Sequence, residues 1–169
     1  RCRAATAEDL KRLVADVAAA ARLATKECGF DAVELHMGHG YLLSQFLSPY
    51  TNRRSDAYGG ELEDRLRFPL EVARAVREAV PADRAVLAKM NLSDGFEKGL
   101  GLAEAVEVAK ALESAGLDGL VLSGGFVSKT PFYMLRGDLP VAEMVRNEPR
   151  FLRRTSLRLF GRMMVPRHD

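Results

Sequence analysis

The sequence predicts an α/β protein whose strands run parallel. Three stretches with apolar residues at helical spacing are each followed by a short apolar run, and the connections between helix and strand are short. Alternation of this kind favours parallel strands joined by right-handed crossovers. The pattern by itself allows either a doubly wound sheet or a (β/α)8 barrel.

The first helix is predicted over about residues 7–28. Thr6 and Asp9 have the spacing of a capping box, and leucine, valine and alanine residues follow at helical positions. Gly29 is typical of a helix C-terminus, and 32–35 reads as a short buried strand. The residues from 38 to 60 are predicted to form a long, functional loop, packed down by Leu42, Leu43, Phe46 and Leu47.

The later elements follow the same pattern: a helix over about 61–80, a strand over 85–90, a helix over about 102–115 and a strand over 117–122. Pro69 predicts a kink or a fresh start within the first of these helices, because proline has no backbone N–H. Gly116 ends the second helix. Asn91 and Asp94 fall in the polar loop predicted after the second strand, and Ser123 opens the turn after the third.

The composition is that of a single globular domain over residues 1–169, with 47% hydrophobic residues. The sequence contains no apolar run of about 18 residues and no secretory signal pattern. Cys2 and Cys28 lie far apart, which favours free thiols over a disulfide or a zinc ribbon. A cytoplasmic location is therefore the expectation.

The net charge of +2 conceals a basic C-terminal end. Residues 146–169 carry seven arginines against Glu148 and Asp169, so this segment has a charge of +5 and the rest of the chain −3. A basic segment of this kind fits an anionic or nucleic-acid partner. It equally fits a solvated helix face with a few ion pairs, because no aromatic residues for base stacking accompany the charge.

Polar side chains occur where the first two strands end. Alternation along the first strand puts Glu34 and His36 on one face, and a glycine-flanked turn can bring His39 back beside His36. Two imidazoles can donate two hydrogen bonds to one oxygen, which suits an oxygen that gains negative charge during a reaction. A metal site with Glu34 as third ligand and a purely structural pair of histidines are the alternatives.

Several motifs in this region resemble those of the Old Yellow Enzyme family of NADH:flavin oxidoreductases, in particular its branch of 2,4-dienoyl-CoA reductase-like enzymes. The motifs are His-x-x-His-Gly-Tyr-Leu-Leu over 36–43, Gln-Phe-Leu-Ser-Pro over 45–49, Asn52-Arg53, Asp-x-Tyr-Gly-Gly over 56–60 and Arg-x-Arg-Phe over 65–68. The arginines in this stretch and Asp56 are expected to brace the long loop. The resemblance implies a (β/α)8 barrel, of which this chain would supply strands four to six followed by a helical tail.

The resemblance also implies an activity: transfer of hydride from NADH or NADPH through FMN to an activated alkene or a related small-molecule acceptor. In this reading His36 and His39 bind the acceptor oxygen and Tyr41 donates a proton as general acid. Lys89 lies against the flavin, where a cation stabilises the reduced ring. Lysine replaces the arginine usual in the family, and an ion pair with Glu34 is its alternative role.

The resemblance covers only the middle of such a barrel, so the chain is expected to be an internal portion of the FMN-binding domain. The phosphate group in barrels commonly sits after strands seven and eight, and this portion is expected not to hold it. Open sheet edges favour a homo-oligomer. A non-catalytic fragment and a module that binds anions or nucleic acid through the arginine-rich tail remain the alternative functions.

Overall fold

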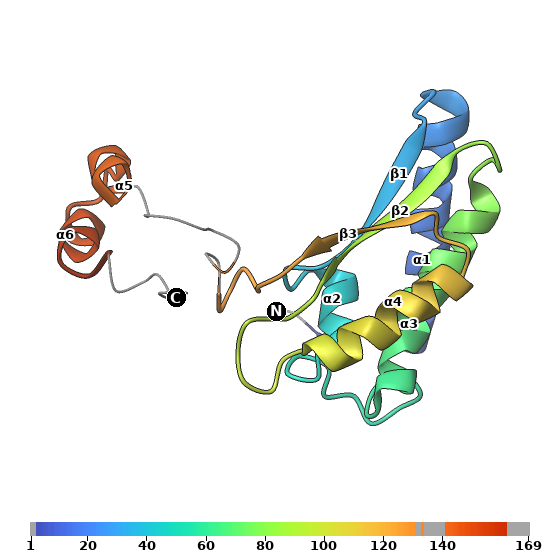
Figure 1. Cartoon of the computed structure of the whole chain (residues 1–169), viewed down its shortest axis with the longest axis horizontal. Coiled ribbons are helices and arrows are strands. Elements are labelled where there is room, and N and C mark those ends of the chain that lie inside the picture. The colour runs from blue at the N-terminus through green and yellow to red at the C-terminus, as the bar shows by residue number, and fades with distance from the viewer. Residues whose placement is uncertain (1–2, 131–132, 134–140, 162–169) are drawn as a thin grey trace.

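The computed structural model describes residues 3–130, 133 and 141–161. Three parallel strands form one sheet in the order β1-β2-β3, with β1 at Ala32–Met37, β2 at Ala85–Asn91 and β3 at Gly119–Ser123. Helices α1, α3 and α4 gather on one side of this sheet (Figure 1). The predicted α/β class with parallel strands is confirmed.

The first helical segment comprises α1 (Ala7–Arg22), which continues as a single π-helical turn, η1 (Leu23–Glu27). The predicted capping box is present: the Thr6 side chain accepts from the Asp9 backbone N–H, and the Asp9 carboxylate accepts from the Thr6 backbone N–H. Gly29 follows with φ +75°, a conformation that glycine adopts without steric cost. Both ends of the segment therefore lie where the sequence predicts them.

Helix α3 (Leu62–Ala79) runs without interruption through Pro69, so the predicted fresh start at this proline is wrong. A proline inside a helix costs about 3 kcal/mol. The helix buries Phe68, Val72 and Val76 completely, and full burial of such side chains contributes about 1.5–3 kcal/mol each. Packing against the sheet therefore outweighs the local cost of the proline.

The loop predicted over 38–60 contains a short helix, α2 (Leu42–Leu47), which the sequence analysis missed. The sequence predicts that its apolar residues pack a loop down, whereas Leu43, Phe46 and Leu47 are buried because the helix turns them toward the core. Strand β1 also extends two residues beyond the predicted end and includes His36. The polar groups thus start on the strand itself.

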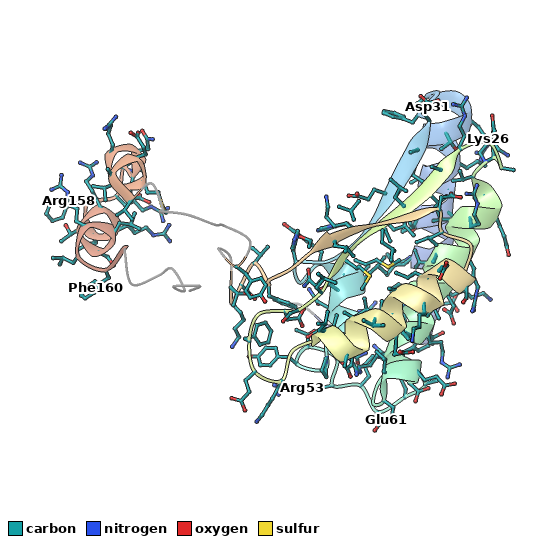
Figure 2. All side chains as sticks on the ribbon, viewed as in Figure 1. Lys26, Asp31, Arg53, Glu61, Arg158 and Phe160 are labelled. Carbon is teal, nitrogen blue, oxygen red and sulfur yellow. The ribbon has the colours of Figure 1, made fainter. Side chains whose placement is uncertain are left out.

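Helix α4 (Leu102–Ser114) ends just before Gly116, as predicted. The C-terminal segment contains α5 (Val141–Asn147) and α6 (Phe151–Phe160), which pack on each other and lie apart from the sheet (Figure 1). The expectation of a helical tail is therefore confirmed for 141–160. Arg158 and Phe160 lie on α6, at the opposite end of the molecule from Lys26 and Asp31 (Figure 2).

The core lies between the sheet and helices α1, α3 and α4. Side chains on one face of β2 (Val86, Ala88 and Met90) are fully buried beneath these helices, as are Met37 of β1 and Val108 of α4. Burial alternates along β2, because Leu87 and Lys89 on its other face are only partly buried. The opposite face of the sheet therefore carries the residues that can contact other molecules.

Candidate active site

The face of the sheet turned away from the helices is arranged in rows across the three strands. The register pairs His36 with Lys89 and Lys89 with Val121, so these three residues form one row. Asn91 and Ser123 pair in the row that follows, at the carboxyl end of the sheet. Residues at this end of parallel strands commonly form ligand sites.

The structure brings the predicted residues His36, His39 and Tyr41 together at this end. The ring centroids of His36 and His39 are 5.1 Å apart, and those of His36 and Tyr41 are 5.0 Å apart. Tyr41 is the N-cap residue of α2, and about half of its surface is exposed. Two imidazoles and a phenol are thus positioned to contact one small molecule.

Burial lowers the pKa of His36 below its ordinary value. The neighbouring His39 and Lys89 lower the pKa of His36 further, and the Glu34 carboxylate opposes them. His36 is therefore neutral at pH 7. A neutral imidazole has one donor and one acceptor nitrogen, which suits hydrogen bonding to an acceptor oxygen.

His39 has a left-handed backbone, with φ +61°, a conformation uncommon for residues other than glycine. Its backbone N–H donates to Asn91 Oδ1 at 3.1 Å, and its carbonyl accepts from the Val127 N–H at 3.0 Å. Its ring Nε2 lies 2.6 Å from Ser123 Oγ. Contacts from β2, β3 and the segment after β3 therefore fix one histidine.

Asn91, which the sequence analysis assigned to a loop, is the last residue of β2 and is almost completely buried. Its amide nitrogen donates to Asp94 Oδ1 at 2.9 Å and to the Gly125 carbonyl at 2.8 Å. Asp94 is equally buried, and its other oxygen accepts from the Leu100 N–H. This network joins the end of β2, the loop that follows β2 and the segment after β3, which all border the histidines.

Asn91 and Ser123 are the site residues that sequence reasoning missed. Both are small polar residues directly after apolar strand positions. Polar residues at strand ends are also common in ordinary turns, so their position alone gave only a weak signal. Their role becomes visible once the strands are in register.

Lys89 forms the ion pair with Glu34 that the sequence analysis named as an alternative, with 2.9 Å between Nζ and Oε1. Both side chains are about one third exposed on the open face of the sheet. An ammonium group has three donors, so pairing with one carboxylate leaves donors for an anionic ring edge. The position therefore fits a flavin and is also stable without one.

An aromatic cluster lies beside the site. The ring of Phe96 makes edge contacts with Tyr50 and Phe126, and the Lys129 ammonium lies over the Tyr50 ring at 4.6 Å. A Cβ at Gly40 would come within 2.3 Å of the Phe126 ring. The turn that carries His39 therefore packs directly on this cluster, and glycine is required for that approach.

Arginine side chains brace the long loop, as the sequence predicts. The Arg65 guanidinium is buried, donates to the Leu47 and Gly60 carbonyls and pairs with Glu104. Asn52 Nδ2 donates to the Phe46 and Tyr58 carbonyls at 2.8 and 2.7 Å, Arg54 pairs with Asp56, and Arg67 Nε donates to the Ala57 carbonyl. These contacts fix the loop that follows the histidines.

The arginine-rich tail lies on α5, α6 and the segment between them. Arg146 pairs with Glu143 at 3.3 Å, and the Arg154 guanidinium donates to the Glu148 carbonyl. Arg162 and Arg167 lie outside the described residues. The described part of the tail thus contains an ion pair and a hydrogen bond on an exposed surface, and binding of an anionic partner stays a prediction.

The described ranges contain neither a candidate metal site nor a helix that could span a membrane. Within 3–130, 133 and 141–161, no group of three His, Cys, Asp or Glu side chains is placed to hold a metal ion. Within the same ranges, no helix is long and apolar enough to cross a membrane. Cys28 is a free, exposed thiol, and Cys2 lies outside the described residues.

The paired histidines, Tyr41 and Lys89 together define a candidate ligand site at the carboxyl end of the parallel strands. The chain belongs to the NADH:flavin oxidoreductase / NADH oxidase family, whose model matches residues 1–125. FMN and NADH are the cofactor and the reductant for which this family is named. The resemblance found in the sequence is therefore confirmed.

Particular relatives agree with this assignment. A 4,4'-dithiodibutanoate disulfide reductase from Rhodococcus erythropolis is 42% identical over 163 residues, which cover 96% of this chain and 40% of that protein. An NADH oxidase from Thermoanaerobacter brockii is 44% identical over 111 residues, or 66% of this chain and 17% of that protein. The chain thus spans well under half the length of either relative.

Solved structures of the family have the same fold. A 2-naphthoyl-CoA reductase in complex with 2-naphthoyl-CoA matches with a TM-score of 0.73 and 30% identity, over 95% of this chain and 23% of that chain. The solved structures that resemble this chain are barrel enzymes, and the three-stranded sheet agrees with part of such a barrel.

Proposed function

We propose that this chain provides the acceptor-binding side of an FMN-dependent NAD(P)H oxidoreductase of the ene-reductase type. The observation that carries the proposal is the cluster of His36, His39 and Tyr41 rings at the carboxyl end of the sheet, one strand away from Lys89. Family membership supports the flavin chemistry, and the geometry supports the choice of acceptor.

Each residue has a separate task in this proposal. Bound FMN would supply a hydride that originates from NADH or NADPH. His36 and His39 donate hydrogen bonds to the carbonyl oxygen of an enone, where negative charge grows as the β-carbon is reduced. Tyr41 gives its phenolic proton to the α-carbon of the enolate. Lys89 stabilises negative charge on the flavin ring.

We further propose that β1, β2 and β3 correspond to strands four to six of a (β/α)8 barrel. The support is the position of the histidine pair at the carboxyl end of β1 and of Lys89 near the end of β2, in the order that the family resemblance implies. Strands β1 and β3 are the edges of the described sheet, so a homo-oligomer that covers an edge remains part of the proposal.

Flavin binding is tested first, by the visible absorption of the protein after incubation with FMN and removal of free flavin. Retained flavin absorbance that NADH or NADPH bleaches supports the proposal. A protein that retains no flavin agrees with the expectation that this portion does not hold the flavin phosphate. The proposed activity is contradicted if a longer protein that also contains strands seven and eight retains no flavin either.

The roles of the side chains are tested with the flavin-loaded protein and 2-cyclohexen-1-one as acceptor. Loss of one oxyanion donor lowers kcat by about 10²–10³-fold, so His36→Ala and His39→Ala are each expected to do so. Tyr41→Phe removes the acid and is expected to cost about 10²–10⁴-fold. Tyr58→Phe is the matched control, because the Tyr58 hydroxyl contacts Glu71 of α3.

A second acceptor separates proton donation from general damage. The Rhodococcus relative is named for a disulfide substrate, 4,4'-dithiodibutanoate, and reduction of a disulfide requires no protonation of carbon. Tyr41→Phe is therefore expected to slow enone reduction far more than reduction of this disulfide. Equal losses with both acceptors, or an equal loss in Tyr58→Phe, would show that Tyr41 is not the proton donor.

A further inference from the structure

We propose that Ser123 is a positioning residue that holds His39 in the tautomer protonated on Nδ1. This inference rests on the proposed function, in which His39 must donate a hydrogen bond to the acceptor oxygen. Ser123 itself does not need to touch the acceptor. It acts through the imidazole of His39.

The contact is short and comes from a rigid element. Ser123 Oγ lies 2.6 Å from His39 Nε2, and the two residues are 84 positions apart in the chain. Ser123 is the last residue of β3 and pairs in register with Asn91. Its carbonyl accepts from the Leu92 N–H at 2.8 Å. The hydroxyl therefore projects from backbone that the sheet holds in place.

The backbone of His39 is held separately. Asn91 accepts its N–H, Val127 donates to its carbonyl, and its φ of +61° places it in a tight turn. These contacts fix the Cα position and leave the two side-chain torsions free. The hydrogen bond to Ser123 is the contact that fixes the ring.

The Ser123 hydroxyl can donate to Nε2 or accept from it, so the contact fits either tautomer of His39, and the proposed need for a donor on Nδ1 selects between them. A neutral imidazole carries one proton, so one nitrogen donates and the other accepts, and the partner of one nitrogen decides the state of the other. If the Ser123 hydroxyl donates to Nε2, the proton of His39 is on Nδ1 and that nitrogen is a donor. If His39 donated to Ser123 instead, Nδ1 would be an acceptor and would repel a carbonyl oxygen.

The contact also bears on the pair of donors. His36 lies 5.1 Å from His39 between ring centroids, so both can address one oxygen only if each presents a donor on the same side. If the His39 ring rotates or changes tautomer, one of the two hydrogen-bond donors to this oxygen is lost. Ser123 thereby determines whether the acceptor oxygen meets two donors or one.

The test compares Ser123→Thr with Ser123→Val in the full chain labelled with 15N-histidine. Both variants have branched side chains of similar shape that suit a strand, and only threonine keeps the hydroxyl. The chain contains three histidines, and the His39 signals are assigned by their loss in His39→Gln. The 15N shifts are expected to show Nδ1–H in the wild type and in Ser123→Thr, and a shift toward Nε2–H in Ser123→Val.

A binding measurement gives the functional consequence. Phenol is titrated into the flavin-loaded protein as a mimic of the acceptor oxygen. Loss of one ordinary hydrogen bond corresponds to about threefold to tenfold weaker binding, expected for Ser123→Val, whereas Ser123→Thr should stay within about twofold of the wild type. Ser123→Ala is the second variant without the hydroxyl, and it should match valine.

Two results would overturn the inference. One is a wild-type His39 protonated on Nε2; the other is a Ser123→Val protein with the same His39 shifts and the same phenol affinity as the wild type. Failure of the proposed function can be distinguished from failure of the inference about Ser123. A protein that binds neither flavin nor phenol still reports the His39 tautomer in the 15N spectrum.

Discussion

Replacement of Asn91 by aspartate tests the network that positions His39, with almost no change in shape. The Asn91 amide donates to Asp94 Oδ1 at 2.9 Å and to the Gly125 carbonyl at 2.8 Å. An ionised aspartate has no donor, so both acceptors lose their partner. The substitution also places a second carboxylate within hydrogen-bond distance of Asp94.

The expected cost follows from these contacts. Each buried polar group left without its partner costs about 1–3 kcal/mol, and two groups are affected, so Asn91→Asp should lower the free energy of unfolding by about 2–6 kcal/mol at pH 7.5. This range is a large fraction of the total stability of a typical domain, about 5–15 kcal/mol. The variant should therefore unfold at a much lower urea concentration than the wild type.

The loss should depend on pH in a defined direction. Burial and the neighbouring carboxylate raise the pKa of the introduced aspartate above its unfolded value of about 3.9. A carboxyl group with a raised folded-state pKa favours the fold when protonated, and this contribution disappears as the pH rises through the folded-state pKa. Protonated aspartate also regains one donor. The destabilisation should therefore be smaller at pH 5 than at pH 7.5.

The assay is urea unfolding followed by far-ultraviolet circular dichroism at both pH values, with a linear extrapolation to water. Asn147→Asp is the control, since Asn147 is exposed on α5 and surface substitutions typically change stability by about 0.5 kcal/mol or less. A loss below about 1 kcal/mol for Asn91→Asp, or an equal loss at both pH values, would refute the role assigned to the network.

Three further substitutions have expected results. Gly40→Ala places a Cβ within 2.3 Å of the Phe126 ring at a φ of +81°, and a strained backbone of this kind costs about 1–3 kcal/mol; an unchanged urea midpoint would contradict the packing. Thr6→Ala removes the cap of α1 and should cost about 1 kcal/mol, whereas Thr6→Ser should restore most of it in the same assay. His36 should titrate below its ordinary pKa of 6.5 by NMR, because burial lowers its pKa. The unfolded chain then binds the proton at a higher pH than the folded chain, so wild-type stability should fall as the pH drops below about 6.5. The His36→Gln variant should lack this decrease.

Local features of the fold were predictable because their causes are local. The Thr6–Asp9 capping box and the stop at Gly29 involve residues a few positions apart, and both lie where the sequence predicts them. The short helix α2 was missed although Leu42, Leu43, Phe46 and Leu47 are at helical spacing, because the surrounding polar and glycine residues favoured a loop.

The site was predictable only in part, for a different reason. His36, His39 and Tyr41 lie within six positions of one another, so one motif contains them all. Their supports are distant in sequence, because His39 bonds Asn91 across 52 positions and Ser123 across 84. Nothing in a single sequence shows which strand-end residues will face each other until the register is known.

The same separations have a consequence for the order of folding. Closing long loops costs chain entropy before any contact offsets that cost, whereas the capping box of α1 joins residues only three positions apart. The hydrogen bonds that hold His39 are therefore expected to form late, after β2 has paired with β1 and β3 with β2. The amide proton of His39, which bonds Asn91 across the sheet, should exchange with solvent only when that pairing opens. The residue proposed to bind the acceptor thus also reports when the sheet is complete.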